Sequence, residues 1–143
     1  MTASKDFMGL NLMKKYYRQL QFLSNRFPMK AGEACEAEYS WEYLYSDKEI
    51  IHNDVRYELA CMLYNIGAMH SYLGCLDKRH NDEGIKISCT HFQYAAWAFQ
   101  TLKETYSLMN MSNDLSEFAM KFNVDLMLVN IKRFLWKFNA IMK

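Results

Sequence analysis

Turn-forming residues are scarce in this chain of 143 residues, which contains a single proline, Pro28, and only five glycines. Because these two residue types interrupt helices and form tight turns, their scarcity favours long helices with short connections. No segment reaches the roughly 18 consecutive apolar residues of a membrane-spanning helix, and residues 1–15 lack the apolar run of a signal peptide. We therefore expect a soluble, cytosolic protein.

The four cysteines lack the spacing of a metal site or of a catalytic centre. There is no CxxC pair, and the histidine nearest to any cysteine is His91, two residues after Cys89. Zinc ligands usually come in pairs about two to four residues apart. No cysteine is followed six positions later by an arginine, so the sequence contains no phosphate-binding loop of that type. We expect reduced and mostly buried thiols.

Motifs for other chemistry are missing as well. The sequence has no phosphate loop, dinucleotide fingerprint or serine nucleophile elbow, and its glycines are scattered. Because no set of acid, base and nucleophile can be assembled, we expect no enzyme, no cofactor and no metal. Gly67 and Gly74 lie seven residues apart on one helix face, where they would permit close approach of another helix.

Charge is low overall and uneven along the chain. The net charge is +1, which predicts no nucleic-acid partner. Residues 1–30 carry six basic side chains and one acidic one, whereas residues 31–60 carry eight acidic and two basic ones. Two interpretations stay open: solvated faces that attract each other across the fold, or a patch that faces a partner.

Apolar residues make up 51% of the chain and aromatic ones 15%, which is ample for a core. Their spacing predicts a helix over residues 6–26 and another over residues 54–76 capped by Asn53, with a further helix running to about Leu108 after a polar loop at residues 77–84. The predicted buried stripes are Leu12, Tyr16, Leu20 and Leu23; then Leu59, Leu63, Ile66 and Leu73; then Ile85, Cys89, Phe92, Ala96 and Phe99.

Residues 36–45 alternate, with aromatic residues such as Tyr39, Trp41 and Tyr43 on one side and glutamates on the other. A period of two predicts a short strand. Because a lone strand leaves its backbone hydrogen bonds unmade, we expect it to pair elsewhere or to lie against a helix.

A last helix is expected from Asp114, which together with Glu117 resembles a capping box. Its predicted buried stripe is Phe118, Phe122, Leu126 and Val129. Residues 131–143 are apolar nearly all round and also basic, so they are either a core helix cut off from its partners, which we favour, or a membrane-surface helix. We expect the chain to be truncated.

Residues 82–86, Asp-Glu-Gly-Ile-Lys, followed by His-Phe-Gln-Tyr-Ala at residues 91–95 and by Ala98-Phe99, resemble the signature of the Bro1 domain. Within that family, residues 77–79 and 88–93 are most similar to the branch of His-domain tyrosine phosphatases. The resemblance implies a mainly α fold of antiparallel helices similar to tetratricopeptide hairpins, with at most one or two short strands near residues 36–45. It also implies that His91 packs between helices or forms a hydrogen bond there.

The resemblance further implies that residues 1–143 are a partial Bro1 domain. The strand-bearing part before Met1 and the helical hairpins after Lys143 would be missing, and any phosphatase activity would lie outside these residues. The implied function is a non-catalytic scaffold of an endosomal-sorting adaptor, cytoplasmic and bound to endosomal membranes through its partners. It would dock the C-terminal amphipathic helix of an ESCRT-III subunit (a charged multivesicular body protein) during multivesicular body sorting.

Carried over from the family, the partner-binding residues are Asp114 and Leu115. Each also has a plain structural interpretation, Asp114 as a helix cap and Leu115 as a core residue, and both roles can coexist. The competing hypothesis for function is a generic helical module that binds some other peptide and is unrelated to ESCRT.

Overall fold

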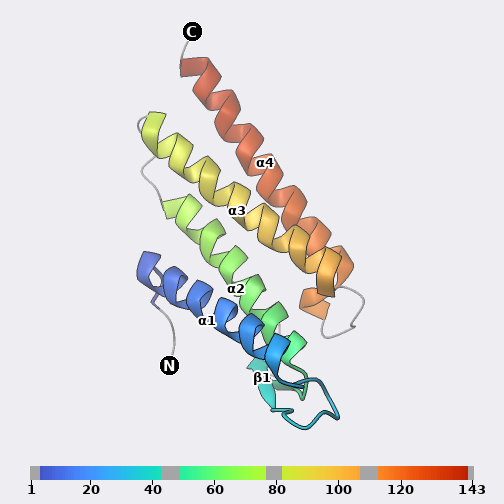
Figure 1. Cartoon of the computed structure of the whole chain (residues 1–143). Helices are drawn as coiled ribbons and strands as arrows, with labels where there is room; N and C mark the ends of the chain where they lie inside the picture. The colour runs from blue at the N-terminus through green and yellow to red at the C-terminus, as the bar shows by residue number, and fades with distance from the viewer. Residues whose placement is uncertain (1–3, 43–48, 77–81, 107–112, 142–143) are drawn as a thin grey trace.

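Four long helices account for most of the chain. The structure, a computed structural model, describes residues 4–42, 49–76, 82–106 and 113–141. In order, these residues form α1 (Phe7–Arg26), β1 (Tyr39–Glu42), β2 (Glu49–His52), α2 (Val55–Leu76), α3 (Asp82–Tyr106), the 3-10 turn η2 (Asn113–Leu115) and α4 (Glu117–Ile141). The helices lie side by side in chain order, and β1 lies at one end of α1 and α2 (Figure 1). The mainly α fold predicted from the sequence is confirmed.

Helix α1 begins where the sequence predicts, but a different side of it is buried. The Asp6 carboxylate caps it by accepting the Gly9 N–H at 2.8 Å. In the predicted stripe, Leu12, Tyr16 and Leu23 are 60%, 39% and 45% exposed, so the prediction is wrong for these three residues and correct for Leu20, which is 5% exposed. The buried apolar residues are Leu10 and Leu20, with Met13 and Tyr17 partly buried beside them. Apolar residues occur on more than one side of α1, so their spacing fits two stripes equally well.

Helices α2 and α3 form the predicted antiparallel hairpin, and all of the residues in their predicted stripes are buried. The N-terminal cap of α2 is Asp54, whose carboxylate accepts the Arg56 N–H at 2.9 Å, and not Asn53 as predicted. Helix α3 already begins at Asp82, inside the loop predicted for residues 77–84. Residues 77–81, and the predicted end of the helix near Leu108, lie outside the described residues.

Two glycines of α2 set the distance between α2 and α3. A methyl group added at Gly67 would lie 3.0 Å from the Phe99 ring and 3.2 Å from the Ala98 Cβ atom. One added at Gly74 would lie 3.2 Å from the Phe92 ring. These three distances are shorter than ordinary van der Waals contact, so larger residues would push the helices apart. The close approach predicted from the glycine spacing is confirmed.

The predicted strand begins later than expected, at Tyr39 and not at Glu36, and it has a partner nearby. Strand β1 pairs antiparallel with β2, in a register that places Tyr39 opposite His52 and Glu42 opposite Glu49. Residues 43–45 of the predicted strand lie outside the described residues. The partner strand β2 was missed because four residues are too few to show a clear alternation. Tyr39 and Trp41 of β1 are partly buried against the core.

Helix α4 differs from the prediction at its start and in its buried side. Its first turn is capped by Ser116, whose Oγ accepts the Ala119 N–H at 3.3 Å, so Asp114 is not the cap. The predicted stripe faces solvent: the exposed fractions are 81% for Phe118, 59% for Phe122, 43% for Leu126 and 60% for Val129. The residues that pack on α3 are instead Met120, Met127, Ile131 and Phe134.

The main core lies along α3, with α2 on one side and α4 on the other. At its centre, Phe92 of α3 stacks on Phe134 of α4 with 5.6 Å between ring centroids. An ion pair of 3.5 Å between Lys103 and Glu117 also joins these two helices. Across the described residues, none of the helices has the length and apolarity to cross a membrane.

Candidate functional site

The predicted binding residues Asp114 and Leu115 lie in η2, the short turn that leads into α4. Leu115 is only 8% exposed and belongs to the main core. Asp114 is half-buried and lies close enough to α2 to affect two of its side chains. Burial, together with the charges of Glu58 and Asp114, raises the pKa of Cys61 to about 12, and the Asp114 charge also contributes to the raised pKa of Tyr57.

The surface next to this turn is apolar. From η2, the exposed stripe of Phe118, Phe122, Leu126 and Val129 runs along α4. These residues are four, four and three positions apart, so they form one continuous row on a helix. A row of this kind matches the anchor spacing of an amphipathic partner helix. We call these four residues the α4 stripe.

A groove of about 680 Å³ lies elsewhere, over α2 and between α1 and α3. We call it the α1–α3 groove. Its floor is apolar, whereas its rim on α1 is basic. It is lined by Lys14, Tyr17, Arg18 and Gln21 of α1, Leu63, Ile66 and His70 of α2, and Gln93, Tyr94, Trp97 and Thr101 of α3. No sequence pattern indicated this groove, because three helices contribute to it.

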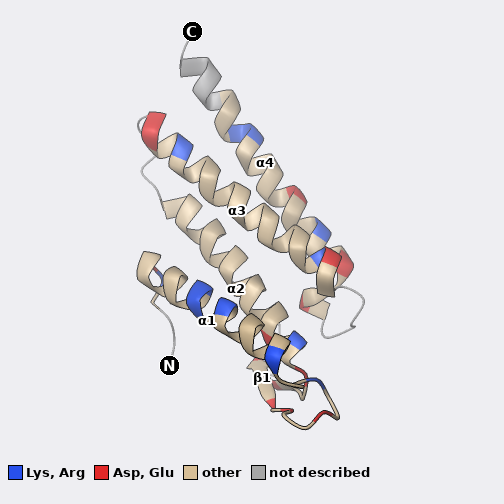
Figure 2. Cartoon of the chain, in the orientation of Figure 1, with Lys and Arg blue, Asp and Glu red and all other residues tan. Residues whose placement is uncertain are grey.

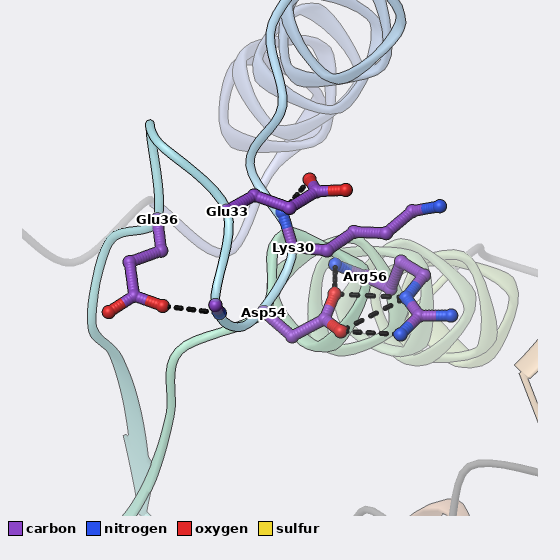
Figure 3. A network of polar contacts seen from close by, with 6 residues as sticks. Lys30, Glu33, Glu36, Asp54 and Arg56 are labelled. Atoms are coloured by element: carbon purple, nitrogen blue, oxygen red, sulfur yellow. Dashed lines mark hydrogen bonds and ion pairs between the residues drawn. The ribbon is translucent and has the colours of Figure 1, made fainter.

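A larger groove of about 1050 Å³ lies at the end of the bundle where α1 leads into α2. It borders the loop of residues 30–36, whose acidic side chains form hydrogen bonds with backbone N–H groups of the same loop (Figure 3). Glu33 accepts the Lys30 N–H at 2.7 Å, and Glu36 accepts the Gly32 N–H at 2.6 Å. Gly32 has a φ of 80°, which favours glycine at this position. Neither groove is lined by residues 113–116.

At the start of α2, an acidic side chain has basic neighbours. Arg56 and Asp54 form an ion pair of 2.6 Å. Although burial opposes it, hydrogen bonds from Arg56 and the charge of Lys30 hold the pKa of Asp54 below its usual value. Asp54 and Arg56 both belong to the acidic residues 31–60, so the support for mutually attracting faces is the attraction between Lys30, from residues 1–30, and Asp54. It does not extend to the middle of α1, where the rim residues Lys14 and Arg18 face the α1–α3 groove.

A histidine pair joins α2 and α3 beside that groove. His70 Nδ1 lies 2.9 Å from His91 Nδ1, and the two side chains are 3% and 7% exposed. One nitrogen must donate while the other accepts, so the ring that accepts is uncharged. Burial, with the charges of Lys14 and His91, lowers the pKa of His70 to about 4. The packing and hydrogen-bonding role inferred for His91 is confirmed.

This pair predicts a loss of stability in acid. Above pH 6.5, the ordinary value, neither folded nor unfolded chain holds a proton on His70, so its contribution is fully present. Between pH 6.5 and about 4 only the unfolded chain binds that proton, and stability falls. We expect His70 to account for a loss on the order of 2 kcal/mol by pH 4.5 in urea denaturation. His70→Gln should show a shallower pH dependence, and identical dependences would contradict this account.

The four cysteines differ in their exposure. Cys61 and Cys89 are buried, and burial raises the pKa of both thiols, which disfavours the nucleophilic thiolate. Cys35 and Cys75 are exposed, so the expectation of mostly buried thiols holds for two of the four. Across the described ranges, no three His, Cys, Asp or Glu side chains come together as metal ligands would.

Comparison with solved structures shows a fold shared with the BRO1 domain of ALIX. A structure of an ALIX BRO1 CHMP4C complex superposes with a TM-score of 0.81 at 25% sequence identity, over 92% of this chain and 40% of that one. A second structure, of ALIX in complex with a viral late domain, has a TM-score of 0.82 at 25% identity and covers 92% of this chain and 20% of that one.

Sequence comparison gives closer relatives. The tyrosine-protein phosphatase non-receptor type 23 of Mus musculus is 45% identical over 126 residues, and that of Homo sapiens is 45% identical over 124 residues. These matches cover 88% and 87% of this chain but only 7% and 8% of the relatives. The resemblance to the His-domain phosphatase branch is thereby confirmed. Since the BRO1-like domain pattern matches residues 1–143, the chain belongs to the BRO1-like domain family.

Proposed function

We propose that this chain is a non-catalytic, protein-binding scaffold of an endosomal-sorting adaptor. It docks the C-terminal amphipathic helix of an ESCRT-III subunit during multivesicular body sorting. In this proposal the protein is cytoplasmic and reaches endosomal membranes through its partners, and residues 1–143 form one part of a larger Bro1 domain. The chain covers 40% of the ALIX chain that it matches in the complex with CHMP4C.

The observation that carries the proposal is the similarity to that complex, at a TM-score of 0.81. It is supported by the 45% identity to tyrosine-protein phosphatase non-receptor type 23 and by the match of the whole chain to the BRO1-like domain. The matched segment is only 8% of the human phosphatase. The proposal therefore does not include any activity that depends on the rest of that protein.

The proposed binding surface begins at Asp114 and Leu115 and continues along the α4 stripe. Asp114 offers a half-buried carboxylate at the start of this surface. Leu115, at 8% exposure, would add a small apolar contact and hold η2 against the core. The α4 stripe supplies the large apolar contacts that a helical ligand needs at steps of three and four residues.

The test is a titration with a synthetic C-terminal peptide of a charged multivesicular body protein. Isothermal titration calorimetry should show saturable binding of the peptide to the chain. The titration is done at concentrations where analytical sedimentation finds the chain as a single species. Phe122→Asp should weaken binding at least about tenfold, because a carboxylate would enter an apolar contact. Asp114→Ala should weaken it less, since Asp114 is already partly buried.

Phe22→Asp is the matched control, because Phe22 is 72% exposed on α1, away from the α4 stripe. It should change the affinity by less than about twofold. Leu115→Asp is a poorer probe, since it would place a charge in the core and unfold the chain. Absence of binding, or full binding by Phe122→Asp, would favour the alternative of a helical module with an unrelated peptide ligand.

A further inference from the structure

The α1–α3 groove combines exposed aromatic side chains with an apolar floor. Trp97 is 60% exposed and Tyr94 is 52% exposed, whereas Leu63 and Ile66 beneath them are 1% and 4% exposed. Exposed tryptophan and tyrosine beside a hollow are the residue types that most often dominate binding energy in protein interfaces. The residues that line this groove come from α1, α2 and α3, so it is separate from the α4 stripe.

Charge in the groove has one sign. Its charged lining residues are Lys14 and Arg18, and within the described chain no acidic side chain lines it. Helix α1 carries Lys14, Lys15, Arg18 and Arg26 and no Asp or Glu, and Figure 2 shows blue without red along this helix. Lys14 Nζ lies 5.6 Å from the Tyr94 ring centroid, so part of the positive charge is held over the aromatic wall. An acidic ligand would relieve the repulsion between the two cations.

The dimensions of the groove fit about two turns of helix. On α1 the lining residues run from Lys14 to Gln21, and on α3 from Gln93 to Thr101. These spans of eight and nine residues correspond to about 11–12 Å of axial rise along a helix. On α1, Lys14, Arg18 and Gln21 follow steps of four and three, which gives a straight ridge for a second helix to pack along.

We propose that the α1–α3 groove binds an acidic amphipathic helix of a partner protein. The apolar side of that helix packs on Tyr94 and Trp97, and its acidic side faces Lys14 and Arg18. This goes beyond the proposed ESCRT-III docking, because it places a second ligand on another surface. Attraction between the acidic side and the two cations also makes the affinity fall with rising salt concentration.

The probe is a phage-displayed library of 16-residue helix-forming peptides. Apolar residues are fixed at heptad spacing along one face of the helix, and the positions that flank this face are randomised among Asp, Glu, Lys, Arg and Ser. Selection is on the full 143-residue chain. We expect enrichment of peptides with acidic flanks, whose affinity is then measured by fluorescence anisotropy. Trp97→Ala should weaken binding at least about tenfold. The double variant Lys14→Glu/Arg18→Glu should do the same and remove the salt dependence.

Two control variants are matched in residue type and charge. Trp136→Ala removes a tryptophan that is 73% exposed on α4, and Lys121→Glu/Lys132→Glu reverses two exposed charges on α4. Both should leave the affinity of the selected peptide within about twofold. The substituted side chains in the groove are exposed or on its rim, and unchanged melting curves verify that each variant folds.

Failure to enrich acidic peptides, or full binding by Trp97→Ala, overturns the proposal. Vesicles of phosphatidylserine and phosphatidylcholine provide a further arm. If the chain binds these vesicles but no peptide, and Lys14→Glu/Arg18→Glu abolishes the vesicle binding, the surface would be assigned to anionic lipid. That result would also overturn the proposal. The ESCRT-III peptide titration separates the two proposals, since Phe122→Asp should affect only that ligand and Trp97→Ala only the selected peptide.

Discussion

Replacement of Phe92 by alanine is expected to lower the free energy of unfolding by about 3–5 kcal/mol. Phe92 is 1% exposed and lies at the centre of α3. Its ring stacks on Phe134 of α4 at 5.6 Å, and on the other side it fills the space that Gly74 leaves on α2. Removing the ring would open a cavity between three helices, which cannot close without moving all of them.

Urea denaturation followed by circular dichroism measures this loss, and thermal unfolding should show a decrease of roughly 10 °C in Tm. Phe118→Ala is the matched control, because Phe118 is 81% exposed on α4. Its effect should stay within about 0.5 kcal/mol. Equal effects for the two variants would show that Phe92 does not hold the three helices together.

Replacement of Glu58 by alanine is expected to destabilise the chain by about 3 kcal/mol. Glu58 is 8% exposed in the first turn of α2. Its carboxylate accepts the Tyr16 hydroxyl of α1 at 2.9 Å and the Trp41 Nε1–H of β1 at 2.6 Å. One side chain therefore joins two helices and the sheet. Burial and the Glu58 charge together raise the pKa of Tyr16 to about 12, which keeps that hydroxyl available as a donor.

Glu58→Gln separates the hydrogen bonds from the charge. A glutamine can accept from Trp41 and donate to the Tyr16 oxygen, so we expect it to cost about 1 kcal/mol. Glu104→Ala is the surface control: Glu104 is exposed and accepts from Gln100 one turn away, and its removal should cost less than about 0.5 kcal/mol. A Glu58→Ala variant as stable as the control would contradict the role of this network.

The hairpin of α2 and α3 could be predicted from the sequence because few arrangements bury its residues. Helix α2 is buried on most of its surface, so almost any apolar stripe chosen on it would be correct. On helix α3 the predicted stripe, which includes Ile85, Cys89 and Phe92, is buried, whereas Tyr94 and Trp97 are exposed. The small residues Gly67 and Gly74 further indicated which side of α2 faces α3.

The buried sides of helices α1 and α4 could not be predicted in this way, because each helix has apolar residues on two sides. Periodicity shows that such sides exist but not which of them a neighbour covers. On α4 the prediction chose Phe118 and Phe122, whereas Met120 and Met127 pack on α3. The predicted helix caps were wrong for a related reason. Several residues near each helix start can accept a hydrogen bond, and the approach of the preceding chain decides among them.

The candidate binding surfaces depend on the tertiary arrangement to different degrees. Asp114 and Leu115 were inferred from a family resemblance, and their role in binding stays a prediction. Tyr94 lies within the recognised signature and Trp97 just after it, yet nothing in the sequence indicated that they face the same hollow as Lys14. That proximity arises only when α1 and α3 flank α2, as they do in Figure 1.

A single nuclear magnetic resonance titration would test the central proposal most directly. Isotopically labelled chain is mixed with the C-terminal peptide of a charged multivesicular body protein, and amide shifts are followed residue by residue. ESCRT-III docking as proposed predicts saturable shifts at residues 113–116 and along the α4 stripe, with little change at Trp97. Absence of shifts, or shifts confined to the α1–α3 groove, would contradict it.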